Sequence, residues 1–152
     1  MNHKFKYKLQ GVLRLKELAE EQIKTNLGRI IREIEEKNQQ IENYRNEINF
    51  YFDRYELAEN SKGDMLGGLR TYMPEFLISH YEKIKKCKDD IYHLDLKKKE
   101  IIKKLYEAKG QVKIFSNLKD KKYSEFKKNL NKKINDELDE IVILKGSSNE
   151  KN

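Results

Sequence analysis

The sequence has few of the residues that interrupt helices or cross-link chains. Its 152 residues include one proline, seven glycines, one cysteine and no tryptophan. A lone cysteine excludes an intrachain disulfide and a zinc site built from several cysteines. No stretch approaches the roughly 18 consecutive apolar residues that a membrane span needs, and the basic start lacks the apolar core of a signal peptide. These absences favour a helical protein of the cytoplasm.

Charge dominates what is present. Charged residues make up 39% of the chain and hydrophobic residues 37%, which is too little apolar material for a thick core. Long helices or coiled coils have this composition, because each helix buries only a narrow stripe. The net charge of +7 is uneven: residues 1–60 carry eleven basic and eleven acidic side chains, and residues 61–152 carry twenty-two and fifteen. The sequence therefore predicts a balanced first arm and a basic second arm.

Apolar residues recur at heptad spacing in both arms. This spacing lets one helix supercoil against another. We call the two sets the first seam (Ile23, Leu27, Ile30, Ile34, Ile41, Tyr44, Ile48, Tyr51, Tyr55, with Lys37 as the polar exception) and the second seam (Ile84, Cys87, Ile91, Leu94, Ile101, Leu105, Ala108, Val112, Phe115, with Lys98 as the exception). Steps nearer the 3.6 period of a straight helix follow at Tyr123, Phe126, Leu130, Ile134, Leu138 and Ile141.

The break between the arms, residues 60–74, reads NSKGDMLGGLRTYMP and contains three glycines and the only proline. Two matched seams around it predict an all-α fold, a long two-helix antiparallel coiled-coil hairpin. We expect a single domain over residues 1–146, with helices at about 6–59 and 74–144, a turn at about 60–73 and a disordered tail at 147–152. Pro74 would lie in the first turn of the second helix, with Thr71 as its N-cap.

Charge suggests a register for this hairpin, in which residue i faces about residue 134 minus i. It brings Glu33, Glu35 and Glu36 near Lys97, Lys98, Lys99, Lys103 and Lys104, and Lys4, Lys6 and Lys8 near the acidic stretch 136–140. Since a hairpin satisfies both seams within one chain, we expect a monomer.

Catalytic and metal chemistry find little support. Gly63 and Gly68 have the glycine spacing of a P-loop, but Leu69 and Arg70 stand where lysine and serine or threonine should be. His80 and Cys87 lie seven apart and fill seam positions more readily than they form a metal site, since two ligands are not enough. A two-helix coiled coil also has no interior pocket that excludes water. We expect no enzymatic activity, no cofactor and no metal.

Two features point to macromolecular partners. Fourteen lysines and four acids between Lys97 and Lys133 could bind nucleic acid, but the lysines are spread around the helix and no arginine follows Arg70. Aromatic residues crowd the break, with more rings than one narrow seam can bury, which indicates either a partner-binding surface or a short helix or loop that covers them. They are Tyr44, Phe50, Tyr51, Phe52 and Tyr55 before it and Tyr72, Phe76, Tyr81 and Tyr92 after it.

The chain resembles the family of the flagellar export protein FliJ over residues 3–144. The opening Phe5-Lys-Tyr7-Lys-Leu9-Gln10-Gly-Val12-Leu13, followed by Lys16-Glu17, is similar to the start of that family. The stretches Tyr72–Phe76, Leu118–Phe126 and Asp136–Glu140 resemble it too, in the same order and spacing.

The resemblance implies a non-enzymatic component of the flagellar type III export apparatus, a coiled coil like the central stalk of rotary ATPases. Such a protein is expected to bind and activate the hexameric export ATPase FliI, contact the export gate protein FlhA and escort flagellar export chaperones. It would be cytoplasmic and peripheral at the cytoplasmic face of the inner membrane. The alternatives are a basic coiled coil that binds nucleic acid and a passive structural coiled coil.

By analogy with the rotary stalk, the end with both termini would enter the ATPase ring and the opposite end would meet the gate. The expected ATPase contacts are Lys4, Lys6, Lys8, Lys127, Lys128, Lys132 and Lys133. The expected gate contacts are Tyr44, Ile48, Tyr51, Tyr55, Phe76 and His80.

Overall fold

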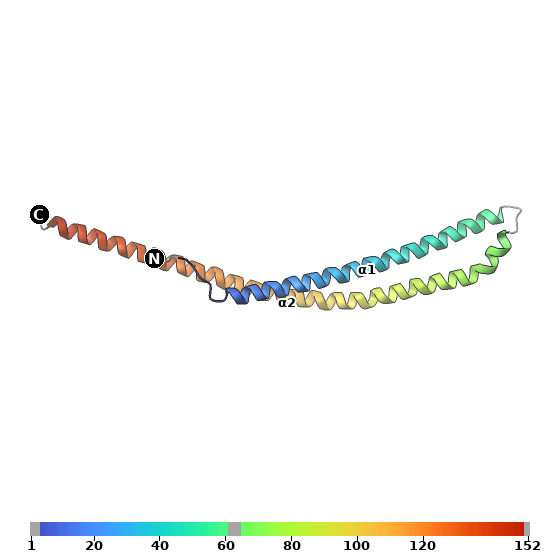
Figure 1. The fold of residues 1–152 in the computed structure, drawn as a ribbon, viewed down its shortest axis with the longest axis horizontal. Helices are drawn as coiled ribbons and strands as arrows, with labels where there is room; N and C mark the ends of the chain where they lie inside the picture. The colour runs from blue at the N-terminus through green and yellow to red at the C-terminus, as the bar shows by residue number, and fades with distance from the viewer. Residues whose placement is uncertain (1–3, 61–64, 151–152) are drawn as a thin grey trace. The chain divides into compact units, whose positions relative to one another are not determined.

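The computed structural model describes residues 4–60 and 65–150, which form two long helices. Helix α1 is Gln10–Glu59 and helix α2 is Met65–Glu150, and no strand occurs among the described residues. Long runs without proline allow such lengths, because each residue between the ends can join the backbone hydrogen-bond ladder. The chain is an antiparallel helical hairpin, which confirms the predicted fold class (Figure 1).

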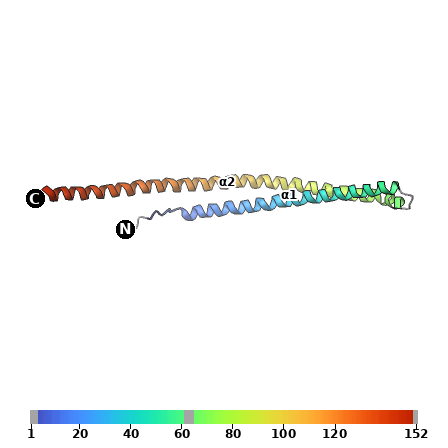
Figure 2. The same ribbon diagram turned by 90° about the horizontal axis from the view of Figure 1, so that it is seen from above.

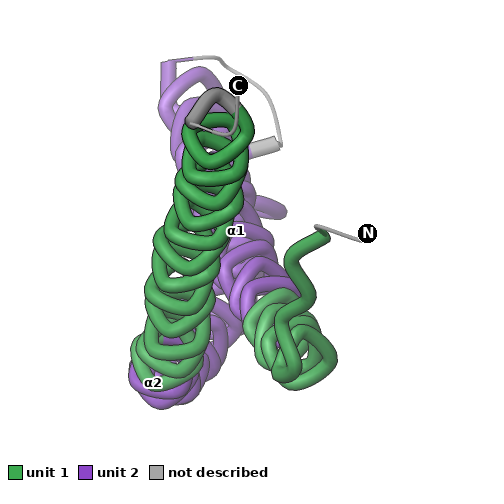
Figure 3. The backbone as a smooth tube through the Cα atoms, turned by 90° about the vertical axis from the view of Figure 1, so that its left-hand side faces the viewer, with its two compact units in different colours: residues 1–21, 106–152 green, residues 22–105 purple. Residues whose placement is uncertain are grey.

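The hairpin divides into two compact units, which Figure 3 shows in different colours. Unit 2 comprises residues 22–105 and therefore contains the end of α1 and the start of α2. Unit 1 comprises residues 1–21 and 106–152. Each unit pairs segments that lie far apart in the sequence, and each is described below by itself.

Unit 2 has a core made of the two seams. Ile41, Ile48, Ile84 and Cys87 are buried together, and Tyr44, Phe76, Leu77 and Ile91 pack against them. Every member of the first seam, and every member of the second seam up to Leu105, is buried or half-buried. The end of α1 and the start of α2 run alongside each other in Figure 1 and overlap in Figure 2. The seams predicted from the heptad spacing are confirmed here.

Five residue pairs join the helices of unit 2 at one constant register, and the numbers in each pair add up to 127. They are Glu47 with His80, Gln40 with Cys87, Lys37 with Asp90, Tyr51 with Phe76, and Tyr44 with Lys83. The predicted register, in which the numbers of two facing residues add up to about 134, was therefore wrong by one heptad. The predicted pairing of Glu33, Glu35 and Glu36 with the lysines of residues 97–104 is shifted by the same seven residues. A slip of seven residues keeps both seams in contact, so the apolar pattern does not distinguish the two registers.

The observed register differs from the predicted one because α2 begins earlier than predicted. The helix begins at Met65, so Gly67, Gly68 and Pro74 all lie inside it and the predicted turn to residue 73 is too long. Thr71 is no N-cap, because its hydroxyl donates to the carbonyl of Gly67 one turn earlier, at 2.8 Å. Pro74 has no N–H for the ladder, and α2 bends in these first turns (Figure 1). Gly63 lies outside the described residues.

Unit 1 joins a short non-helical segment to the later part of α2. Lysines and apolar residues alternate from Lys4 to Leu9, and Phe5 and Tyr7 are half-buried while the lysines are exposed. The Tyr7 hydroxyl donates to the carbonyl of Phe115 at 3.0 Å. The helix predicted from about residue 6 begins only at Gln10. At the other end α2 runs to Glu150, where residues 147–150 were predicted to be a disordered tail, and residues 151–152 lie outside the described part.

Candidate partner-binding sites

Aromatic rings from the end of α1 and the start of α2 stack on one another in unit 2. Tyr51 from α1 lies against Phe76 from α2, with ring centroids 4.5 Å apart and planes 18° from parallel. Phe76 in turn stacks on His80 at 4.0 Å, and Tyr44 meets the edge of His80 at 5.7 Å. We call these four rings the aromatic column. Stacked rings from two helices fix both their separation and their rotation.

His80 is the polar centre of this column and is only 8% exposed. Its Nδ1 lies 3.0 Å from the carbonyl oxygen of Phe76, and its Nε2 lies 2.5 Å from the Oε2 of Glu47 on α1. Both ring nitrogens thus face oxygen atoms, and which of them donates depends on the tautomer of the ring. The pair ties α2 to α1 with a charge-assisted hydrogen bond.

Two further contacts secure the first turns of α2. The Tyr51 hydroxyl donates to the carbonyl of Leu69, and the Arg70 Nε donates to the Tyr55 hydroxyl at 3.0 Å. The hydrogen bond to Tyr55 is also the main cause that raises the pKa of Arg70 above its usual value. The predicted gate residues on α1 therefore hold the beginning of α2 in place.

The six predicted gate residues are close together, but they differ in exposure. Ile48 is 6% exposed and His80 8%, so both face the partner helix, while Tyr44, Tyr51, Tyr55 and Phe76 are half-buried. The exposed apolar side chains of this region lie outside the seams; they are Phe50, Phe52, Leu57, Tyr72, Ile78 and Tyr81. The heptad register could have found them, because rings outside a seam point away from the partner helix.

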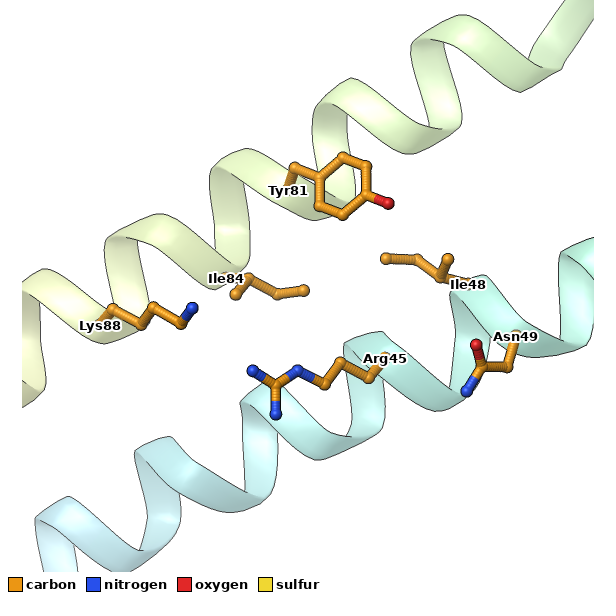
Figure 4. Close-up of a pocket in the computed structure, with 6 residues that line it drawn as sticks. All are labelled: Arg45, Ile48, Asn49, Tyr81, Ile84 and Lys88. Atoms are coloured by element: carbon orange, nitrogen blue, oxygen red, sulfur yellow. The ribbon is translucent and has the colours of Figure 1, made fainter.

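Tyr81 joins the seam at a small pocket of about 300 Å³. Figure 4 shows Tyr81, Ile84 and Lys88 from α2 facing Arg45, Ile48 and Asn49 from α1. Its floor is apolar and its rim carries two cations and an amide. Such a surface can accept an apolar side chain with an acidic neighbour.

The second candidate site is in unit 1, where residues 4–9 run along α2. Phe5 packs against Tyr123 and Phe126, with centroids 5.3 and 5.6 Å apart. A groove of about 550 Å³ follows, which we call the basic groove; it is lined by residues 4–9 and by Leu118, Lys122, Glu125, Phe126 and Asn129. Four lysines around aromatic rings can bind an acidic segment that carries an apolar side chain.

The predicted ATPase contacts separate into two sets. Lys4, Lys6 and Lys8 line the basic groove beside residues 118–129, so their predicted proximity to the acidic residues 136–140 was wrong. Lys127 lies 5.6 Å from the Tyr123 ring centroid next to the groove. Lys128, Lys132 and Lys133 are exposed on α2 and are absent from the groove lining. The sequence does contain a signal for the basic groove, which is the alternation of lysine with Phe5, Tyr7 and Leu9.

The described residues contain no group of three or more histidine, cysteine, aspartate or glutamate side chains that could hold a metal ion. Cys87 is buried and its thiol donates to the Gln40 side chain at 3.5 Å. Within the described ranges no helix is long and apolar enough to cross a membrane.

Comparison with known families gives a match over nearly the whole chain. The family described as flagellar FliJ protein matches residues 5–151. The chain belongs to the FliJ family. The FliJ family is a component of the flagellar export apparatus, so this chain is a component of that apparatus. No curated protein and no solved structure matches it.

Proposed function

We propose that this FliJ-family protein binds and activates the hexameric export ATPase FliI in the manner of a rotary stalk, contacts the export gate protein FlhA and escorts flagellar export chaperones. The observation that carries the proposal is the family match over residues 5–151. The protein would work without catalysis in the cytoplasm, held at the inner membrane by its partners.

The basic groove supports the ATPase part of the proposal. Lys4, Lys6 and Lys8 are exposed along one short segment, while Phe5 and Tyr7 anchor that segment to α2. Cations held in a fixed line speed encounter with an acidic partner and fix its orientation. Lys127, Lys128, Lys132 and Lys133 would extend this contact along α2.

The aromatic column supports the gate part. Tyr44, Tyr51, Tyr55 and Phe76 are half-buried, so each leaves part of its ring accessible. Ile48 and His80 are buried and would hold these rings in place. Partly exposed aromatic side chains on a rigid support are typical of the residues that dominate binding energy.

Hydrolysis by the cognate ATPase tests the first contact. Adding the wild-type protein should stimulate hydrolysis, and reversing Lys4, Lys6 and Lys8 to Glu should raise the concentration for half-maximal stimulation about tenfold, since three modest ion contacts are lost. The control reverses Lys85, Lys86 and Lys99, which are also exposed, lie in unit 2 and change the net charge by the same amount. If the wild-type protein does not stimulate hydrolysis, the proposal is wrong.

Binding to the cytoplasmic part of the gate protein tests the second contact. Replacing Tyr51 and Tyr55 by alanine should weaken binding while helicity by circular dichroism persists. Because Tyr51 also stacks on Phe76, the control is Ile41→Ala, which weakens the same core but leaves every ring of the aromatic column in the chain. Equal loss of binding in both variants would mean that the tyrosines act only through the fold.

A further inference from the structure

The last part of α2 carries an apolar stripe that lies open to solvent. Every side chain from residue 131 to residue 148 is exposed. Within this stretch Ile134 is 42%, Leu138 53% and Ile141 50% exposed. Together with the half-buried Leu130 they form what we call the C-terminal stripe. Steps of four, four and three residues keep these side chains on one face of a helix.

Charges along this stretch are divided by sign. Basic residues surround the first half of the C-terminal stripe and acidic residues the second half. The basic set is Lys127, Lys128, Lys132 and Lys133, and the acidic set is Asp136, Glu137, Asp139 and Glu140. A helix whose charge reverses along one apolar face is complementary to a copy of itself that runs in the opposite direction.

We propose that the C-terminal stripe is the interface of an antiparallel dimer with a second copy of this chain. A two-fold axis near Ile134 brings Leu130 of each copy against Leu138 of the other and Ile134 against Ile134. The same axis places the four lysines of each copy beside the four carboxylates of the other. A parallel pair would oppose like charges along the whole stretch, so charge selects the antiparallel arrangement.

This proposal goes beyond the monomer that the sequence favours. A hairpin satisfies both seams within one chain, which favours a monomer. The second seam, however, ends at Phe115. It does not cover Ile134, Leu138 or Ile141, which have apolar helical spacing and remain exposed. A second copy supplies an apolar face opposite Ile134, Leu138 and Ile141, which the hairpin itself does not provide.

Sedimentation equilibrium of the full chain over a wide concentration range tests the proposal. The wild-type chain should dimerise, and Leu138→Asp should raise the dissociation constant at least tenfold, because each interface then buries two unpaired carboxylates. The control is Ile143→Asp. Ile143 is 68% exposed and lies nine residues, or two and a half turns, from Ile134, so it is on the opposite face. A chain that stays monomeric throughout, or a dimer equally weakened by both variants, overturns the proposal.

Charge reversal identifies the partner. A chain with Lys128→Glu and Lys132→Glu, and another with Asp136→Lys and Glu140→Lys, should each be monomeric alone, since the two ends of each dimer would repel. Mixed in equal amounts, the two chains should form a heterodimer. If mixing restores nothing, the copies do not pair in this way.

A different occupant would give a different pattern. If Leu138→Asp weakens binding to the cognate export ATPase while the wild-type chain is monomeric, the stripe is covered by the ATPase and the dimer is wrong. The four lysines beside the stripe are also proposed ATPase contacts, so the second copy and the ATPase would compete for them. Dimerisation is measured on the chain alone, so failure of the dimer and failure of the proposed ATPase activation are distinguishable.

Discussion

Two stretches of α2 have similar apolar spacing and opposite surroundings. In unit 2, Ile84 and Cys87 are buried against Ile41 and Ile48 of α1. In unit 1, Ile134 and the residues that follow it at helical spacing are exposed. Spacing alone therefore predicts a helix with an apolar face, whereas burial depends on what lies opposite.

The largest expected effect is a cross-link that either forms or does not. Gln40 contacts Cys87 across the seam, so Gln40→Cys should be cross-linked to Cys87 by mild oxidation or a short dithiol reagent. The register of about 134 would instead place residue 47 opposite Cys87, which makes Glu47→Cys the matched control. Electrophoresis of the denatured chain without reductant separates the cross-linked form. Efficient cross-linking of the control alone would show that residue 47, and not residue 40, lies opposite Cys87. The register between α1 and α2 would then be shifted by one heptad.

The core of unit 2 should respond far more strongly to truncation than the C-terminal stripe. Ile48→Ala should lower the free energy of unfolding by about 2–4 kcal/mol, since it leaves a cavity in a packed seam. Ile134→Ala should change it by less than about 0.5 kcal/mol, because the side chain is exposed and alanine is a good helix former. Urea unfolding followed by circular dichroism measures both, at a concentration too low for dimers. Equal losses of unfolding free energy in the two variants would mean that Ile134 is as well packed in solution as Ile48.

His80 and Glu47 should show a coupling that no pair in the exposed stretch has. His80→Ala should cost about 2–3 kcal/mol, because it removes a stacked ring and a charge-assisted hydrogen bond. Glu47→Ala should cost about 1 kcal/mol. The double variant should fall short of the sum by about 0.5–2 kcal/mol, as expected for residues in direct contact. Additive losses would mean that the hydrogen bond contributes nothing to holding α2 on α1.

Some features of the fold can be predicted from the sequence and others cannot. The two seams and the hairpin follow from heptad spacing, since that periodicity leaves one face to bury. The register did not follow, because a slip of seven residues preserves the pattern and the decisive contacts, such as Lys37 with Asp90, are single pairs. The start of α2 did not follow either, because proline is typical of the first turn of a helix but a helix can also bend at proline and continue, as α2 does at Pro74.

The sequence constrains the candidate sites less than it constrains the fold. Clustering of aromatic residues near the loop is visible in the sequence, but which rings are exposed depends on the seam register, as with Tyr51 inside and Phe50 outside. The basic groove needs the contact between Tyr7 and Phe115, which are 108 residues apart. No local pattern encodes a contact at that separation.

The smallest expected effect concerns the half-buried ion pair that accompanies the observed register. The Lys37 Nζ lies 3.2 Å from the Asp90 Oδ2, and this hydrogen bond is the main cause that raises the pKa of Lys37 above 10.5, with partial desolvation acting against it. A raised pKa means that the folded state favours the ammonium form, so the pair stabilises the fold fully below pH 10.5 and the stabilisation is lost as pH rises through the raised pKa.

Asp90→Asn should therefore destabilise the protein slightly at pH 8 and by progressively less as pH rises above 10.5. The control is Glu33→Gln, which removes the pair between Arg29 and Glu33 at 2.9 Å within α1. Arginine stays charged over this range, so the small effect of the control should not shrink with pH. Each variant is compared with the wild type by urea unfolding at each pH, which cancels other titrations. If the effect of Asp90→Asn is independent of pH, Lys37 and Asp90 do not pair in solution, and the polar support for the observed register reduces to His80 with Glu47 and Gln40 with Cys87.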